Sequence, residues 1–170
     1  MIAGADWLPP LVLLEDSKGN WTLYEEVLYG WFRRDFLDSL PPFPGKRVGL
    51  KRYPLQNGKE ATFWHLISEG QTEKDRKIDL RRCERIRWPR PIIEAFCSRR
   101  PQPNDRIVWW RNQRRKVWRF VLALQDFRYL AVVADRGEYV LPWTAYCVEH
   151  EHQRERLRKE YEAYWKSQNC

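Results

Sequence analysis

The chain has 170 residues, enough for one domain with a sizeable core, and 43% of them are hydrophobic. No stretch approaches the roughly 20 apolar residues of a membrane-spanning helix, and no segment has the form of a signal peptide. These features predict a cytoplasmic protein with no membrane partner, and the net charge of +8 favours an anionic one.

The positive charge is concentrated in one part of the chain. Residues 76–119 contain 15 Lys and Arg against 4 Asp and Glu, a balance of +11, whereas the remainder contains 16 against 19, a balance of −3. A regional block of this kind is typical of a surface that meets nucleic acid. The 10 Trp residues could stack on bases, although most of them are expected in the core.

The first 55 residues are interpreted as a helix and strand extension packed on the core of a domain formed by residues 56–170. A capping box, Thr22-x-x-Glu25, predicts a helix from about Leu23 to Leu37. Its inner face is predicted from the helical spacing of Leu23, Val27, Leu28, Trp31, Phe32 and Phe36. Lys46 to Tyr53 alternates as a strand does. A role of this extension as a dimer or partner surface stays open.

A helical region is predicted next. A turn at residues 56–59 precedes a short helix or turn over Ala61–Ser68, and residues 69–78 are polar enough for a loop. Asp79 is the expected N-cap of an arginine-rich helix, whose buried seam is formed by Leu80, Cys83 and Ile86. Pro91 begins a further helix with Ile92, Ile93 and Phe96 on its inner face. The prolines in Pro101–Asn104 end that region.

The period then changes to two, which predicts strands. Four runs are expected to be strands: Arg106–Asn112, Arg115–Gln125, Tyr129–Asp135 and Glu138–Val148. Their turns are short, at Gln113-Arg114, Asp126-Phe127 and Arg136-Gly137, so neighbouring strands must be antiparallel. A charged helix over Glu149–Lys166 has an inner stripe of Leu157, Tyr161, Tyr164 and Trp165. The predicted fold is α+β: N-terminal helices, a four-stranded antiparallel meander and a C-terminal helix.

Common catalytic motifs are missing from the sequence. It contains no Gly-x-x-x-x-Gly-Lys, Gly-x-Gly-x-x-Gly or Cys-x-x-Cys pattern and no Gly-x-Ser-x-Gly elbow. Four cysteines without paired spacing predict reduced thiols rather than disulfides. Cys147-x-x-His150-x-His152 lacks a fourth nearby ligand. We therefore expect neither a metal nor another cofactor.

His65 and two hydroxyl residues are the candidates for chemistry. His65 has apolar neighbours, as structural histidines do, but it precedes the basic block. An imidazole beside guanidiniums can remove the 2′-hydroxyl proton of RNA while the cations stabilise the phosphorane. Strand alternation places Thr144 and Tyr146 on one face, with Trp143 and Ala145 on the other. Two hydroxyls on one face can orient a phosphate, or the face can be exposed without a function.

The order of these segments resembles a known superfamily. Phe63-Trp64-His65-Leu66 precedes Asp79-Leu-Arg-Arg-Cys-Glu-Arg-Ile-Arg-Trp88 and Ile92-Ile93-Glu94, and the meander is followed by Leu141-Pro-Trp-Thr-Ala-Tyr146 and Arg158-Lys-Glu-Tyr-Glu-Ala-Tyr164. Over residues 60–165 this resembles phage- and prophage-associated members of the barnase–EndoU–colicin–RelE superfamily of metal-independent ribonucleases. The superfamily's fold is helices followed by a four-stranded antiparallel sheet.

The resemblance implies a site drawn from both halves of the domain. His65 would be the general base or acid, Arg82 and Arg85 the phosphate clamp, and Thr144 and Tyr146 the residues that orient the scissile phosphate or leaving group. Arg81 and Arg76 would be in reserve for the clamp. The residues predicted to contact RNA are Arg76, Arg81, Arg87, Trp88 and Arg111.

Three hypotheses follow from the sequence. The first is an endoribonuclease that cleaves RNA, with tRNA as one candidate, as a toxin or phage-conflict effector. The second is a phage protein that binds nucleic acid without catalysis. The third is a basic module that docks on an acidic protein, such as an antitoxin or immunity protein. The first and third are compatible, because a toxin can be held by its antitoxin.

Overall fold

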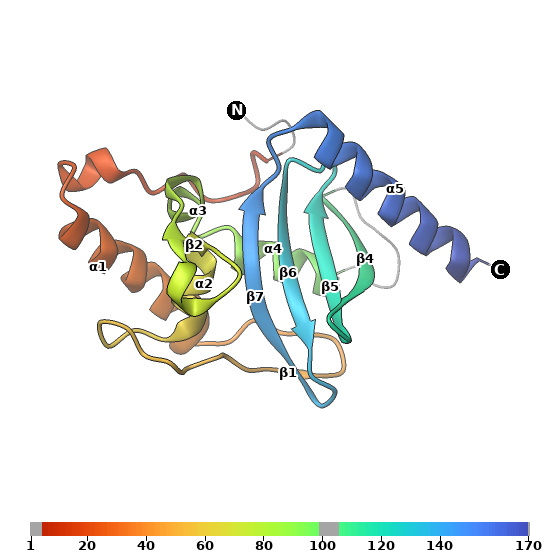
Figure 1. Ribbon diagram of the computed structural model, residues 1–170, viewed down its shortest axis with the longest axis horizontal. Coiled ribbons are helices and arrows are strands. Elements are labelled where there is room, and N and C mark those ends of the chain that lie inside the picture. Colours follow the sequence, from red (N-terminus) through yellow and green to blue (C-terminus); the bar gives the residue numbers. More distant parts are fainter. Residues whose placement is uncertain (1–4, 99–105, 170) are drawn as a thin grey trace.

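The computed structural model describes residues 5–98 and 106–169, and it has an α+β fold (Figure 1). The predicted break at Pro101–Asn104 and Cys170 lie outside these residues. The helical elements are η1 (Leu14–Ser17), α1 (Trp21–Phe32), η2 (Arg33–Leu37), α2 (Ala61–Ile67), η3 (Glu73–Asp75), α3 (Leu80–Glu84), α4 (Pro89–Ser98) and α5 (Glu151–Gln168). The strands are β1 (Arg47–Val48), β2 (Ser68–Glu69), β3 (Lys77–Ile78), β4 (Ile107–Arg114), β5 (Val117–Leu124), β6 (Tyr129–Asp135) and β7 (Tyr139–Cys147).

The main sheet has the order β1-β7-β6-β5-β4. Its strands β4 to β7 form the predicted antiparallel meander. The prediction omitted β1, which adds a parallel strand beside β7 and makes the sheet five-stranded and mixed. The alternation over Lys46–Tyr53 does favour a strand, yet only two of its residues pair. Arg47 and Val48 lie opposite Tyr139 and Val140, at the start of β7.

The two faces of the sheet pack against different helices. On one face, Ile92 and Phe96 of α4 join sheet residues such as Leu122 in the larger of two hydrophobic clusters. On the other face, Leu157 and Tyr161 of α5 pack on a smaller cluster. Figure 1 shows α4 behind the sheet and α5 in front of its upper end. The lower part of the front face, beside α2, is therefore left for the site described below.

The N-terminal segment shares the larger cluster. Four side chains of α1 and η2 belong to it: Tyr24, Leu28, Phe32 and Phe36. Leu23 and Val27, which we expected on this inner face, are 54% and 43% exposed. Asn20 caps α1 by accepting a hydrogen bond from the Leu23 amide, in place of the predicted box. The buried side chains recur every fourth residue from Tyr24, so Leu23 and Val27, each one position before a buried residue, lie on the flank of the helix.

The arginine-rich helix is shorter than its sequence pattern suggests. Asp79 caps α3 as predicted, accepting hydrogen bonds from the Arg81 and Arg82 amides. Cys83 and Ile86 are buried, but Leu80 is 43% exposed, so the predicted seam is wrong at its first residue. In α3, which has five residues, Leu80 lies in the first turn, before the helix reaches the core.

A β-bulge changes which residues of β7 share a face. The register with β6 shifts between Val132, opposite Thr144, and Val133, opposite Pro142, so Trp143 is the extra residue. Trp143 and Tyr146 both pack against the cluster beneath α5, whereas Ala145 is buried in the other cluster. The prediction that Trp143 and Ala145 share a face was therefore wrong, since strict alternation does not continue through a bulge.

Candidate functional site

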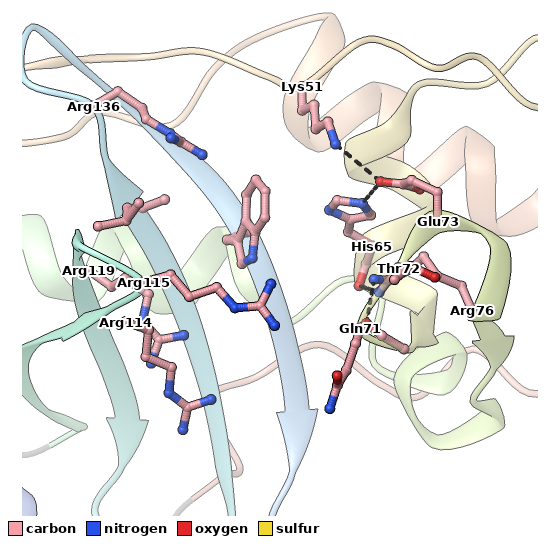
Figure 2. Close-up of a pocket in the computed structure, with 14 residues that line it drawn as sticks. Lys51, His65, Gln71, Thr72, Glu73, Arg76, Arg114, Arg115, Arg119 and Arg136 are labelled. Carbon is pink, nitrogen blue, oxygen red and sulfur yellow. Dashed lines mark hydrogen bonds and ion pairs between the residues drawn. The ribbon is translucent and has the colours of Figure 1, made fainter.

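A pocket of about 520 Å³ lies between the open part of the sheet and the segment that follows α2. Figure 2 shows cationic side chains of the sheet on one side, and Lys51, His65, Glu73 and Arg76 on the other. Its lining residues are Lys51, His65, Gly70, Gln71, Thr72, Glu73, Arg76, Arg114, Arg115, Val117, Arg119, Ala134, Arg136 and Trp143. Six of these carry a cationic side chain and one carries a carboxylate, so the pocket suits an anionic ligand.

His65 is held at the inner end of this pocket by a fully buried helix. Every residue of α2 is buried, and His65 is 4% exposed. The Nε2 atom of His65 lies 2.8 Å from Oε1 of Glu73, and the same oxygen accepts a hydrogen bond from Lys51 Nζ at 3.1 Å. The imidazole meets the Trp143 ring edge to face, with 5.1 Å between centroids. The ring is thus fixed in position by packing and by a carboxylate.

The pKa values of this pair favour a neutral imidazole. Burial lowers the pKa of His65 below its ordinary 6.5, and the Arg76 and Lys51 charges lower it further, against the opposing effect of Glu73. Burial alone would raise the pKa of Glu73, but hydrogen bonds from His65 and Lys51 outweigh it and lower that pKa. A neutral imidazole beside an ionised carboxylate carries its proton on Nε2. Nδ1, which faces away from Glu73 in Figure 2, is then free to accept a proton.

Glu73 lies in a loop that Arg76 connects to α2 by hydrogen bonds. The Arg76 guanidinium donates to Ser68 Oγ at 2.9 Å and to the carbonyls of Ser68 at 2.7 Å, Gly70 at 3.1 Å and His65 at 3.4 Å. A Cβ at Gly70, where φ is +152°, would lie 2.8 Å from Arg76 Cα, so only glycine fits this approach. Arg76 therefore acts mainly as a brace for the loop, although it also lines the pocket.

Arg119 and Arg136, on the sheet side of the pocket, have fewer protein contacts than Arg76. Arg119 donates from Nε to Asn112 Oδ1 at 3.0 Å, and burial lowers its pKa. Arg136 lies over the Trp143 ring at 5.5 Å, and Lys51 lies over the same ring at 5.7 Å. A phosphate in the pocket would meet these side chains as well as the imidazole.

Three of the five predicted catalytic residues lie together. Arg82 donates from Nη1 to Thr144 Oγ1 at 3.0 Å and to the Ser68 carbonyl at 2.7 Å, and its guanidinium lies 5.3 Å from the Tyr146 ring. The Arg82 side chain is only 10% exposed. Nη1 of Arg82 thus connects α3, β2 and β7. The Ser68 carbonyl also accepts from Arg76, which connects this group to the loop beside His65.

Arg85 and Arg81 are not among the residues that line the pocket. Arg85 donates to the Arg81 carbonyl at 3.1 Å, lies over the Trp88 ring at 5.1 Å and has a side chain that is 14% exposed. Arg81 is more open and forms an ion pair with Glu149. The two predicted clamp residues, Arg82 and Arg85, therefore have protein partners already.

The remaining predicted RNA contacts are spread over the molecule. Arg87 lies over the Trp31 ring at 3.8 Å. Trp88 is 5% exposed and donates from Nε1 to the Pro9 carbonyl at 2.9 Å, so its ring is not open to a base. Arg111 pairs with Asp135 at 2.9 Å. None of these three lines the pocket of His65.

The pocket also contains residues that we did not predict. They are Lys51, Glu73, Arg114, Arg115, Arg119, Arg136 and Trp143. They come from a coil before α2, the β2–β3 loop, two sheet turns and the strands β4, β5 and β7, so no spacing in the sequence connects them. The available signal was a polar stretch with one Glu eight residues after His65, followed later by cations beside predicted turns.

The described part of the chain shows neither a metal-binding group nor a membrane-spanning helix. Residues 5–98 and 106–169 contain no group of three His, Cys, Asp or Glu side chains that could hold a metal ion. Within the same ranges, no helix is long and apolar enough to cross a membrane.

Comparison of the chain with protein-family models, with curated proteins and with solved structures found no match.

Proposed function

We propose that this protein is a metal-independent endoribonuclease whose site is the pocket of His65. The observation that carries the proposal is the His65–Glu73 pair, which opens into a pocket lined by six Lys and Arg side chains. A base whose second nitrogen is held by a carboxylate, next to cations that stabilise a developing anion, is what transesterification of RNA needs. The resemblance to the barnase–EndoU–colicin–RelE superfamily supports the same proposal.

The reaction assigns a role to each group. Nδ1 of neutral His65 removes the proton of a 2′-hydroxyl, and the 2′-oxygen attacks the adjacent phosphorus. The P–O5′ bond breaks, which leaves a 2′,3′-cyclic phosphate and a 5′-oxygen that takes a proton from the Lys51 ammonium or from water. Glu73 stabilises the imidazolium that forms. Arg119 and Arg136 face the phosphorane charge, in place of Arg82 and Arg85.

The biological setting we propose follows the resemblance. The protein would act on cytoplasmic RNA, for instance tRNA, as a toxin or phage-conflict effector, and an acidic antitoxin or immunity protein would cover the basic pocket. Thr144 and Tyr146 would act through Arg82, by holding α3 against β7, rather than on the phosphate.

The second candidate is a phage protein that binds nucleic acid without cleaving it. It is favoured by the low exposure of His65, at 4%, because a recessed imidazole can also serve only to support the pocket. Both candidates predict RNA binding that weakens steeply with salt. They differ in whether the RNA is cut.

A matched pair of histidine variants separates the two. Purified protein is incubated in EDTA with an RNA labelled at its 5′ end, and the ends of the products are identified. The proposal predicts 2′,3′-cyclic phosphate and 5′-hydroxyl ends from the wild type and from His152→Gln, and at least about 100-fold slower cleavage by His65→Gln. His152 is exposed at the start of α5, so its variant controls for contaminating nuclease and for loss of activity during purification. RNA that is bound but stays intact would establish the second candidate, and equal cleavage by both variants would refute the role of His65.

A further inference from the structure

The turn between β4 and β5 carries three consecutive cations, and two of them, Arg114 and Arg115, line the pocket. Arg114 ends β4, Val117 begins β5, and Arg115 and Lys116 form the two-residue turn with φ of 49° and 66°. Positive φ at both positions is typical of a type I′ hairpin turn, which strongly prefers Asn-Gly. Arg and Lys are strained in this conformation by the contact of Cβ with the backbone. This turn therefore has a backbone conformation that Arg and Lys disfavour.

These three cations lie exposed at the tip of the hairpin. Arg114, Arg115 and Lys116 are exposed, and their side chains form no hydrogen bond or ion pair with the residues that the structure describes. Arg76 and Arg82 differ from them, because both donate to backbone carbonyls and stabilise the fold. The tip of the hairpin therefore contributes charge to the surface without contributing ion pairs to stability.

The tip is continuous with the pocket of His65. Arg114 and Arg115 line that pocket, and Figure 2 shows them on the sheet side, across from His65. Arg114 also lines a neighbouring pocket of about 430 Å³, together with Tyr146 and Arg156. A strand that leaves the first pocket toward the second would pass over this tip.

We propose that Arg114, Arg115 and Lys116 form a ridge that binds the phosphate backbone of an RNA strand beside the nucleotide held near His65. This inference rests on the proposed function for the choice of RNA as the ligand. It adds a binding element outside the reacting groups. It also gives a reason for residues that do not suit the turn, since strained backbone is found where function requires it.

The test makes stability and binding move in opposite directions. The double variant Arg115→Asn with Lys116→Gly gives the turn its preferred residues and removes two charges. We expect its Tm to rise by about 2–4 °C. Binding is measured with a short fluorescent 2′-O-methyl RNA, which lacks the hydroxyl needed for cleavage. Two lost phosphate contacts should make the negative slope of log affinity against log salt shallower by about 1.4. A tenfold dilution of salt should therefore raise the affinity of the double variant by a factor about 25-fold smaller than for the wild type.

Lys18→Asn is the control for the change of turn residues in the double variant. Lys18 is exposed, has φ of 55° and precedes Gly19, so the control also replaces a left-handed cation by Asn. It should raise the Tm similarly and leave RNA affinity unchanged. Equal affinity and salt slope in the double variant and the wild type would overturn the ridge while leaving the ribonuclease proposal in place. Absence of RNA binding and cleavage by the wild type would instead refute the proposed function.

Discussion

Replacing Arg82 by Met tests whether this arginine braces the fold or binds phosphate. Its guanidinium donates to Ser68 O and Thr144 Oγ1 at 2.7 and 3.0 Å from a side chain that is 10% exposed. A buried hydrogen bond to a charged group contributes about 1.5–3 kcal/mol. Ser68 O keeps its bond from Arg76, so the loss falls mainly on Thr144. We expect about 2–4 kcal/mol of destabilisation, or a Tm lower by roughly 4–16 °C.

Arg81→Met is the control for this measurement. Arg81 is the neighbouring residue of α3, its side chain is 55% exposed, and its ion pair with Glu149 is at the surface. Such a pair contributes at most about 1 kcal/mol. Urea unfolding and 2′-O-methyl RNA binding are measured for both variants. The reasoning fails if Arg82→Met is as stable as the wild type but loses RNA affinity, because Arg82 would then be a phosphate ligand.

Three further predictions concern groups near or behind the pocket. Glu73→Gln should slow RNA cleavage about 10- to 100-fold in single-turnover assays, because the amide keeps a hydrogen bond to His65 but supplies no charge to the imidazolium. The lowered pKa of His65 keeps the folded protein from binding a proton as pH falls below 6.5, so stability should decline there in urea titrations, and less so in His65→Gln. Burial raises the pKa of the Cys83 thiol to about 12, so native protein at mildly alkaline pH should show no iodoacetamide label at Cys83 in peptide mapping, whereas unfolded protein should.

The local parts of the fold could be predicted because local chemistry determines them. Alternation and short turns predicted both ends of each strand from β4 to β7 to within two residues, and the Asp79 cap was correct. The first turn was placed too early, at Gln113-Arg114. Arg115 and Lys116 form it instead, and neither residue is favoured at positive φ. A turn made from unsuitable residues gives no sequence signal.

The non-local parts could not be predicted in this way. β1 pairs with β7, which lies some 90 residues later in the sequence, and two residues are too few to show a period. The resemblance implied Arg82 and Arg85 as a phosphate clamp, but neither a resemblance nor a spacing shows whether a guanidinium has a protein partner. Glu73 lies in a polar loop, and only the folded loop brings it to His65.

The state of the His65 imidazole is the most direct test of the proposed site. Its ¹⁵N chemical shifts are followed by NMR as a 2′-deoxynucleoside 3′-phosphate is added at neutral pH. We predict that free His65 is neutral with its proton on Nε2, and that the bound phosphate shifts Nδ1 and raises the pKa of the imidazole, since a nearby anion favours its charged form. Resonances of His65 that stay unchanged at saturating nucleotide would contradict the proposal that this pocket is where RNA phosphate meets its base.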